Sequence, residues 1–149
     1  MAQQYYERSN KLKKFIEEQK IYFVATAAED SRVNISPKGM DSLRVVGKNR
    51  VIWLNVTGSG NETSAHVQEN PRMTLMVAAF DGNPMILRLF GKEKVIHKND
   101  SQWNGSYAFL DPIPGTQQLY YFKVDLDKTS SGLTVLIFDI MNYRPTPNI

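Results

Sequence analysis

The chain has 149 residues, of which 42% are hydrophobic and 22% are charged, and it carries a net charge of +3 and no cysteine. This balance predicts a folded protein with room for one domain over residues 1–149, and it excludes a disordered tail. Without cysteine, disulfide scaffolds, thiol nucleophiles and thiolate metal sites are excluded, and a reducing, cytoplasmic location is expected. No apolar run approaches the ~20 residues that span a bilayer, so we expect no membrane partner.

The first predicted element is an amphipathic helix over residues 9–19, capped by Ser9 or Asn10, with apolar residues at spacings of three and four. After this helix, short runs rich in β-branched and aromatic residues alternate with turn residues. The predicted strands cover residues 21–28, 32–36, 43–46, 51–56, 73–80, 85–97, 119–126 and 133–139. A helical stretch at 61–69, ending before Pro71, and a short helix within residues 98–110 interrupt them. Closely spaced strands favour antiparallel pairing, so we expect a mainly β barrel with two or three flanking helices.

The sequence contains only two histidines, His66 and His97, and no pattern that brings them together. A three-histidine metal site is therefore excluded, and we expect no metal. A lone histidine without partners is usually structural or solvent-facing, which is the interpretation we adopt for both. No Gly-x-Ser-x-Gly elbow supports a hydrolase.

Two polar segments follow predicted strands. In residues 36–39, Pro37 ends or edges a strand and leaves Ser36 and Lys38 where a hydroxyl and an ammonium could hold a phosphate. In residues 56–64, two glycines precede a helix start, and Ser59 and Glu62 have the spacing of a capping box. Free amides at a helix N-terminus suit phosphate, but the segment is neither a Walker loop nor a dinucleotide fingerprint. Taken alone, each segment is explained by ordinary structure, namely a glycine-rich turn with a capped helix and an exposed lysine at a strand end.

Taken together, the order of these segments resembles a known family. Ser36-Pro37-Lys38-Gly39, a strand at 51–55, and the stretch 60–72 before another strand are similar to the pyridoxamine 5′-phosphate oxidase-like flavoproteins, which are FMN-binding split barrels. The stretches 114–118 and 128–132 also resemble that family, so the likeness extends over about residues 10–135. It implies a homodimer with FMN at the subunit interface.

The resemblance also implies a set of site residues. Lys38 at the strand end would hold the FMN phosphate, together with polar residues at the helix start, namely Asn61, Thr63 and Ser64. Ser36 would lie close to the same pocket. The end of the intervening strand would lie along the flavin ring through its backbone, at Leu54, Asn55, Val56 and Thr57. Among the aromatic residues, Phe90 and Trp103 are the first candidates for contact with the ring.

This chain departs from the family's pattern at several positions. Members that oxidise pyridoxamine phosphate carry Ser-Arg-Lys where this chain has residues 61–63, and an Arg-Gln pair where it has Met85 and Ile86. Gln117 and Ser131 stand where many relatives have arginine and cysteine. These differences argue against oxidation of vitamin B6.

The expected function is therefore an FMN-dependent oxidoreductase that transfers hydride through flavin N5 between a small-molecule donor, a nicotinamide being one candidate, and an unidentified acceptor. A deazaflavin is a lesser alternative to FMN. A non-catalytic module that binds flavin or haem is a second hypothesis, and a barrel that binds single-stranded nucleic acid is a third. Five basic and three acidic residues in the first twenty supply +2 of the +3 charge, so the rest of the chain is nearly neutral, which counts against nucleic acid.

Overall fold

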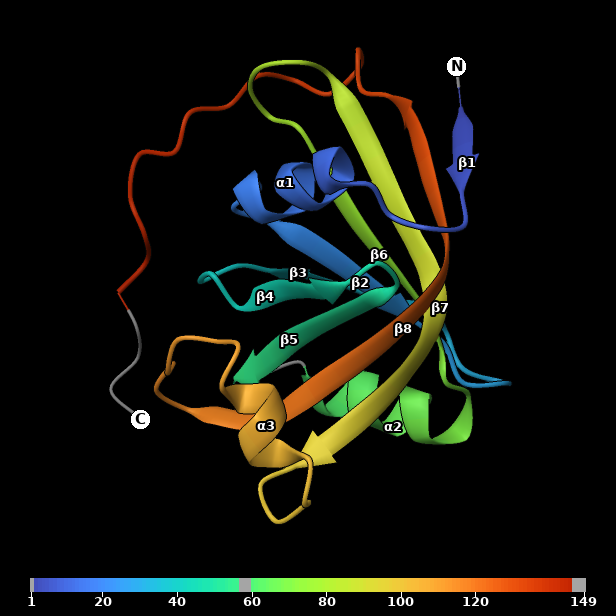
Figure 1. The fold of residues 1–149 in the computed structure, drawn as a ribbon, viewed down its shortest axis with the longest axis vertical. Coiled ribbons are helices and arrows are strands. Elements are labelled where there is room, and N and C mark those ends of the chain that lie inside the picture. The colour runs from blue at the N-terminus through green and yellow to red at the C-terminus, as the bar shows by residue number, and fades with distance from the viewer. Residues whose placement is uncertain (1, 57–59, 146–149) are drawn as a thin grey trace.

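The structure is a computed structural model that describes residues 2–56 and 60–145. Within these residues, eight strands form one antiparallel sheet in the order β3-β2-β6-β7-β8-β5-β4, with β1 paired to β8. The sheet coils into a barrel (Figure 1). The strands are β1 (Gln3–Tyr5), β2 (Tyr22–Thr26), β3 (Asn34–Lys38), β4 (Leu43–Gly47), β5 (Arg50–Val56), β6 (Arg72–Ala78), β7 (Met85–His97) and β8 (Thr116–Ser131).

The barrel is open between β3 and β4, which are the two ends of the strand order and do not pair with each other within the described residues. Three helices flank it, namely α1 (Asn10–Glu18), α2 (Gly60–Glu69) and α3 (Trp103–Tyr107). Helix α1 lies near one end of the barrel, and α2 and α3 lie near the other (Figure 1). Across the described residues, no helix has the length and apolar character needed to cross a membrane.

Large apolar side chains fill the barrel interior. The centre of this core is the stacked pair Trp53 and Tyr120, whose ring centroids lie 4.1 Å apart and whose planes differ by 9°. Tyr22 meets the Trp53 ring edge-on, and Phe122 and Leu75 are fully buried beside them. Burial of this apolar surface stabilises the barrel and makes the inward faces of β2, β5, β6, β7 and β8 rigid.

A second, smaller core lies on the outer side of β5 and β8, beneath α3. It contains buried aliphatic residues and one tryptophan, namely Ile52, Leu54, Ile96, Trp103, Leu110 and Leu119. Successive residues of a strand point to opposite faces, so Trp53 and Leu54 belong to different cores although they are neighbours in sequence.

The predicted helix over residues 9–19 forms as α1, and the Ser9 hydroxyl caps it by accepting a hydrogen bond from Leu12 N at 3.3 Å. Helix α2 ends at Glu69, before Pro71, as expected. The short helix predicted within residues 98–110 forms as α3.

The strand predicted over residues 133–139 was wrong. The pairing of β8 with β7 ends at Met85 opposite Ser131, so the following segment has no strand to pair with. The amide of Phe138 donates to the carbonyl of Phe80, and most of the segment's large apolar side chains are exposed. Alternating apolar residues were not enough to make a strand without a partner.

Candidate functional site

Strand β3 presents three polar side chains to the barrel interior. Asn34, Ser36 and Lys38 alternate along the strand, so they share one face. Val24 of β2 lies directly opposite Ser36 and belongs to the barrel core, which shows that this face is the inner one. Ser36 is buried, and Asn34 and Lys38 are half-buried. The polar residues of the first predicted segment therefore line the open side of the barrel.

Helix α2 packs its N-terminal half against these residues. Thr63 and Ser64 are buried, and Asn61 is exposed. The Asn34 amide donates to Ser36 Oγ at 3.2 Å and to Thr63 Oγ1 at 3.4 Å. These bonds join β3 to α2, so the structure brings together the two segments that the sequence predicted as phosphate-binding.

Lys38 lies over the aromatic core. Its Nζ atom is 5.8 Å from the centre of the Trp53 ring, a distance at which a cation is attracted to the ring face. Burial lowers the pKa of Lys38 from its ordinary value. Met40 and Asp41, two and three residues further on, both have left-handed backbone conformations, with φ of 62° and 54°. Such conformations are costly for residues other than glycine, so the turn after Lys38 is held in a strained form by its surroundings.

The end of β5 is tied to α2 through β8. The Asn55 amide donates to Gln118 Oε1 at 3.3 Å, and Gln118 Nε2 donates to Ser64 Oγ at 3.4 Å. The hydroxyl of Tyr120 donates to the same Gln118 oxygen at 3.2 Å. Burial raises the pKa of Tyr120, against the opposing effect of a hydrogen bond with Ser64. Gln118 thus links two of the predicted site residues, Asn55 and Ser64.

Other predicted residues lie differently. The Leu54 side chain points into the second core, and its backbone N–H donates to Ser42 O at 2.8 Å. In the described part of the chain, pairing of β4 with β5 ends at Trp53, so the backbone of Asn55 and the half-buried Val56 continues past the β4 ladder. Thr57 and Ser59 fall outside the described residues.

A buried carboxyl group on β7 was missed by the sequence analysis. Glu93 is 4% exposed, and its Oε2 accepts a hydrogen bond from Trp53 Nε1 at 3.4 Å, while Oε1 has no hydrogen-bond partner. Burial raises the pKa of Glu93 well above its ordinary value, so the carboxyl group is favoured in its neutral form. The sequence pattern could have revealed that Glu93 points inward. It continues the alternation of the inward-facing residues Leu87 and Leu89 past the bulge at Gly91.

The histidines and two aromatic candidates have other surroundings. His66 is buried with Nδ1 3.2 Å from Thr26 Oγ1, which is a structural contact, and His97 is exposed. Trp103 stacks on Tyr107 in the second core, with ring centroids 5.4 Å apart. Phe90 is half-buried on the outside of the barrel, beside a shallow groove.

The donor set of the site fits a phosphate-bearing ligand. The Asn34 amide and the hydroxyls of Ser36 and Thr63 meet where α2 contacts β3. Ser64 follows in α2, and Lys38 is the last residue of the same face of β3. Phosphate is bound by hydroxyl, amide and ammonium donors of this kind near helix N-termini. A flat ring could continue along the last residues of β5, beyond the β4 ladder. Together, an antiparallel barrel open at one side and this polar helix start define the class of the split barrels.

Comparison with known proteins agrees with this class. A family model described as pyridoxamine 5′-phosphate oxidase matches residues 9–124. The pyridoxamine 5′-phosphate oxidase family protein ustO of Aspergillus flavus is 38% identical over 137 residues, which are 89% of this chain and 55% of that protein. This chain therefore spans about half the length of that relative. The chain belongs to the pyridoxamine 5′-phosphate oxidase family.

Solved structures share the fold at low sequence identity. A variant of HupZ from Group A Streptococcus has a TM-score of 0.67 at 16% identity, covering 82% of this chain and 98% of that one. The haem storage protein HutZ of Vibrio cholerae has a TM-score of 0.59 at 16% identity, over 85% and 98% of the two chains. An FMN-binding protein of Syntrophomonas wolfei has a TM-score of 0.55 at 16% identity, over 75% and 78%. The fold therefore occurs in proteins described as binding flavin and in one described as storing haem.

Proposed function

We propose that the protein is an FMN-binding oxidoreductase whose phosphate site is formed by Lys38, Ser36 and the start of α2. The observation that carries this proposal is the pair of hydrogen bonds from Asn34 to Ser36 and Thr63, because it joins β3, the strand that ends at Lys38, to the first half of α2. Lys38 supplies positive charge to that cluster, and Thr63 and Ser64 supply hydroxyl donors. Asn61, exposed at the first turn of α2, is a further contact for the phosphate in this proposal.

The flavin ring is proposed to lie along the end of β5, at Leu54, Asn55, Val56 and Thr57. Support comes from the end of the β4 ladder at Trp53: Leu54 N–H still donates to Ser42 O, and among the described residues the backbone of Asn55 and Val56 lies beyond the ladder. Bound FMN would supply hydride transfer through its N5 atom. The chain would bind and orient the ring. A nicotinamide is the first hydride donor to test, and the proposal keeps the expected cytoplasmic location.

The same proposal includes a homodimer, since family members of this type place their cofactor between two subunits. Light scattering of the purified protein at micromolar concentration should give twice the mass of the chain. A monomer that binds FMN with full affinity would contradict the shared pocket and leave the phosphate site intact.

The test of FMN binding is an absorption spectrum of the purified protein, followed by titration with FMN and with riboflavin. We expect flavin bands or a saturable change, and bleaching of the bound flavin when a nicotinamide donor is added without oxygen. Binding without bleaching by any donor would favour the non-catalytic flavin module. No binding of either flavin would refute the proposal.

A haem-binding module is the second candidate, favoured by the shared fold with the haem storage protein HutZ. Haem iron is commonly held by histidine. His66 is buried against Thr26, and His97 is exposed at the end of β7, so His97 is the more accessible ligand. A Soret band after haem addition that disappears in His97→Ala would support this candidate over FMN.

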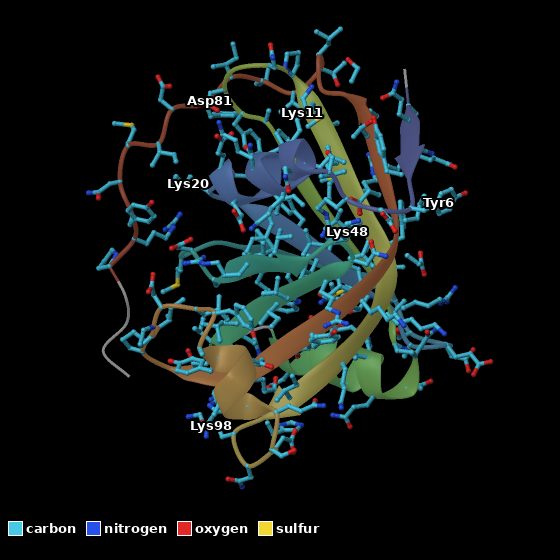
Figure 2. The ribbon with its side chains drawn as sticks, in the orientation of Figure 1. Tyr6, Lys11, Lys20, Lys48, Asp81 and Lys98 are labelled. Atoms are coloured by element: carbon cyan, nitrogen blue, oxygen red, sulfur yellow. The ribbon has the colours of Figure 1, made fainter. Side chains whose placement is uncertain are left out.

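Charge distribution does not favour the nucleic-acid hypothesis. Lys11 and Lys20, on or next to α1, lie near one end of the molecule, and Lys98 lies near the other (Figure 2). A nucleic-acid site requires basic groups gathered along one face. Binding of single-stranded DNA with a steep salt dependence would contradict our choice.

A further inference from the structure

We infer that Gln118, which lies outside the set of predicted ligand contacts, is a positioning residue that fixes the phosphate end of the flavin site against its ring end. This inference rests on the proposed function. Its basis is geometric, because Gln118 is the residue that hydrogen-bonds both Asn55 at the end of β5 and Ser64 in α2.

The side-chain amide of Gln118 makes three hydrogen bonds. Its oxygen accepts from Asn55 Nδ2 at 3.3 Å and from Tyr120 OH at 3.2 Å, which occupies both lone pairs. Its nitrogen donates to Ser64 Oγ at 3.4 Å. One amide thus bonds all three neighbours, and it links the end of β5 to α2.

The effect on Ser64 concerns the direction of its proton. Gln68 Nε2, from the next turn of α2, also donates to Ser64 Oγ, at 3.3 Å. With two N–H donors on its oxygen, Ser64 has its own proton left to donate, either to Tyr120 or to a ligand oxygen. Gln118 thus keeps the Ser64 hydroxyl as a donor, which is the role that a phosphate requires.

The rigid part of this arrangement is the barrel core. Tyr120 stacks on Trp53, and Lys38 lies over the other residue of that stack, Trp53. Gln118 is therefore attached to the same core as Lys38, so the ammonium and the Ser64 hydroxyl are held relative to each other through β5 and β8. Loss of Gln118 should loosen Ser64 without moving Lys38.

The experiment compares FMN and riboflavin, which differ in the phosphate. Gln118→Met keeps the length of the side chain and removes all three hydrogen bonds. We expect the ratio of FMN affinity to riboflavin affinity to fall by about threefold to tenfold, the effect of a neutral hydrogen bond. A merely structural loss would weaken both flavins equally and leave the ratio unchanged. Gln102→Met, which removes an exposed glutamine bonded to Lys94, is the matched control and should change neither affinity.

A double-mutant cycle identifies the route of the effect. If Gln118 acts through Ser64, then Gln118→Met in a Ser64→Ala background should lower the ratio no further. Additive effects of the two substitutions, or an unchanged ratio in Gln118→Met, would overturn the inference. The proposed function would still stand if the unmodified protein binds FMN. Failure of the unmodified protein to bind either flavin would refute the proposed function and the inference with it. Should Gln118→Met fail to fold, Gln118→Asn retains a half-buried amide that is too short to span both partners, and the same fall in ratio is expected.

Discussion

The rings of Trp53 and Tyr120 stack across strands β5 and β8 at the centre of the barrel, with centroids 4.1 Å apart. Three polar contacts of the candidate site start from this pair. Lys38 lies over the Trp53 ring, Glu93 accepts the Trp53 indole N–H, and Gln118 accepts the Tyr120 hydroxyl. The stack is fully buried, so the site is attached to the most rigid part of the molecule.

Replacing Lys38 should weaken binding of FMN and leave binding of riboflavin unchanged. Lys38→Ala removes a charged donor to the phosphate, which contributes roughly 1.5–3 kcal/mol. Calorimetric titration of both flavins measures the effect. Lys98→Ala, which replaces an exposed lysine in the turn after β7 (Figure 2), is the control. Unchanged FMN affinity in Lys38→Ala would remove Lys38 from the phosphate site.

The Glu93 carboxyl group should make the stability of the protein depend on pH. Burial raises the pKa of Glu93 in the folded protein above its ordinary value of 4.5, so the folded state binds a proton that the unfolded state releases. Stability from this group is complete below pH 4.5 and decreases as pH rises toward the folded-state pKa, by up to about 1.4 kcal/mol per pH unit.

Glu93→Gln tests this expectation, because glutamine still accepts from Trp53 and does not titrate. Urea denaturation of both proteins between pH 5 and 8 measures the free energy of unfolding. The difference between the variant and the unmodified protein should shift in favour of the variant as pH rises. Contributions of groups that both proteins share cancel in the comparison. Parallel stability curves would show that Glu93 keeps an ordinary pKa.

Short sequence patterns correctly predicted the helices and strands whose limits depend on neighbouring residues in the chain. Helix α2 ends where Pro71 requires it, and β7 spans the predicted residues 85–97. The segment 133–139 shows the limit of this reasoning, since its apolar pattern matches a strand but no neighbouring strand remains to pair with it.

The site was predictable in its two main segments and not in the residues that join them. Ser36 and Lys38 were identified from a strand end before a turn, and Thr63 and Ser64 from a helix start. Gln118 is 54 residues from Ser64 in sequence, and no local pattern reports a contact over that separation. The resemblance to a family suggested roles for these residues, which stay predictions, and only the fold showed which side chains contact them.

Breaking the buried ion pair between Arg8 and Asp127 should strongly destabilise the protein. The two Arg8–Asp127 hydrogen bonds are each 3.0 Å long, and the side chains are 1% and 3% exposed. Asp127→Ala leaves the guanidinium buried without its partner, which costs about 3–5 kcal/mol. Glu7→Ala breaks the exposed pair with Lys48 and should cost less than about 1 kcal/mol. Equal losses for the two variants in urea denaturation would contradict the burial of the Arg8 pair.

Adding one methyl group at Gly91 should disrupt the pairing of β7 with β8. Glu93 is on β7 and Gln118 is on β8. A Cβ atom there would overlap the backbone oxygen of Lys123, at the bulge where the register shifts. Backbone must move to admit it, so Gly91→Ala should lose about 1–3 kcal/mol or more. Gly105→Ala is the matched control, because a Cβ atom in α3 meets no atom within 4 Å and alanine favours a helix by about 1 kcal/mol. Thermal denaturation should therefore show a lower Tm for Gly91→Ala and an equal or higher Tm for Gly105→Ala, and the reverse order would exclude a close approach of the two strands at Gly91.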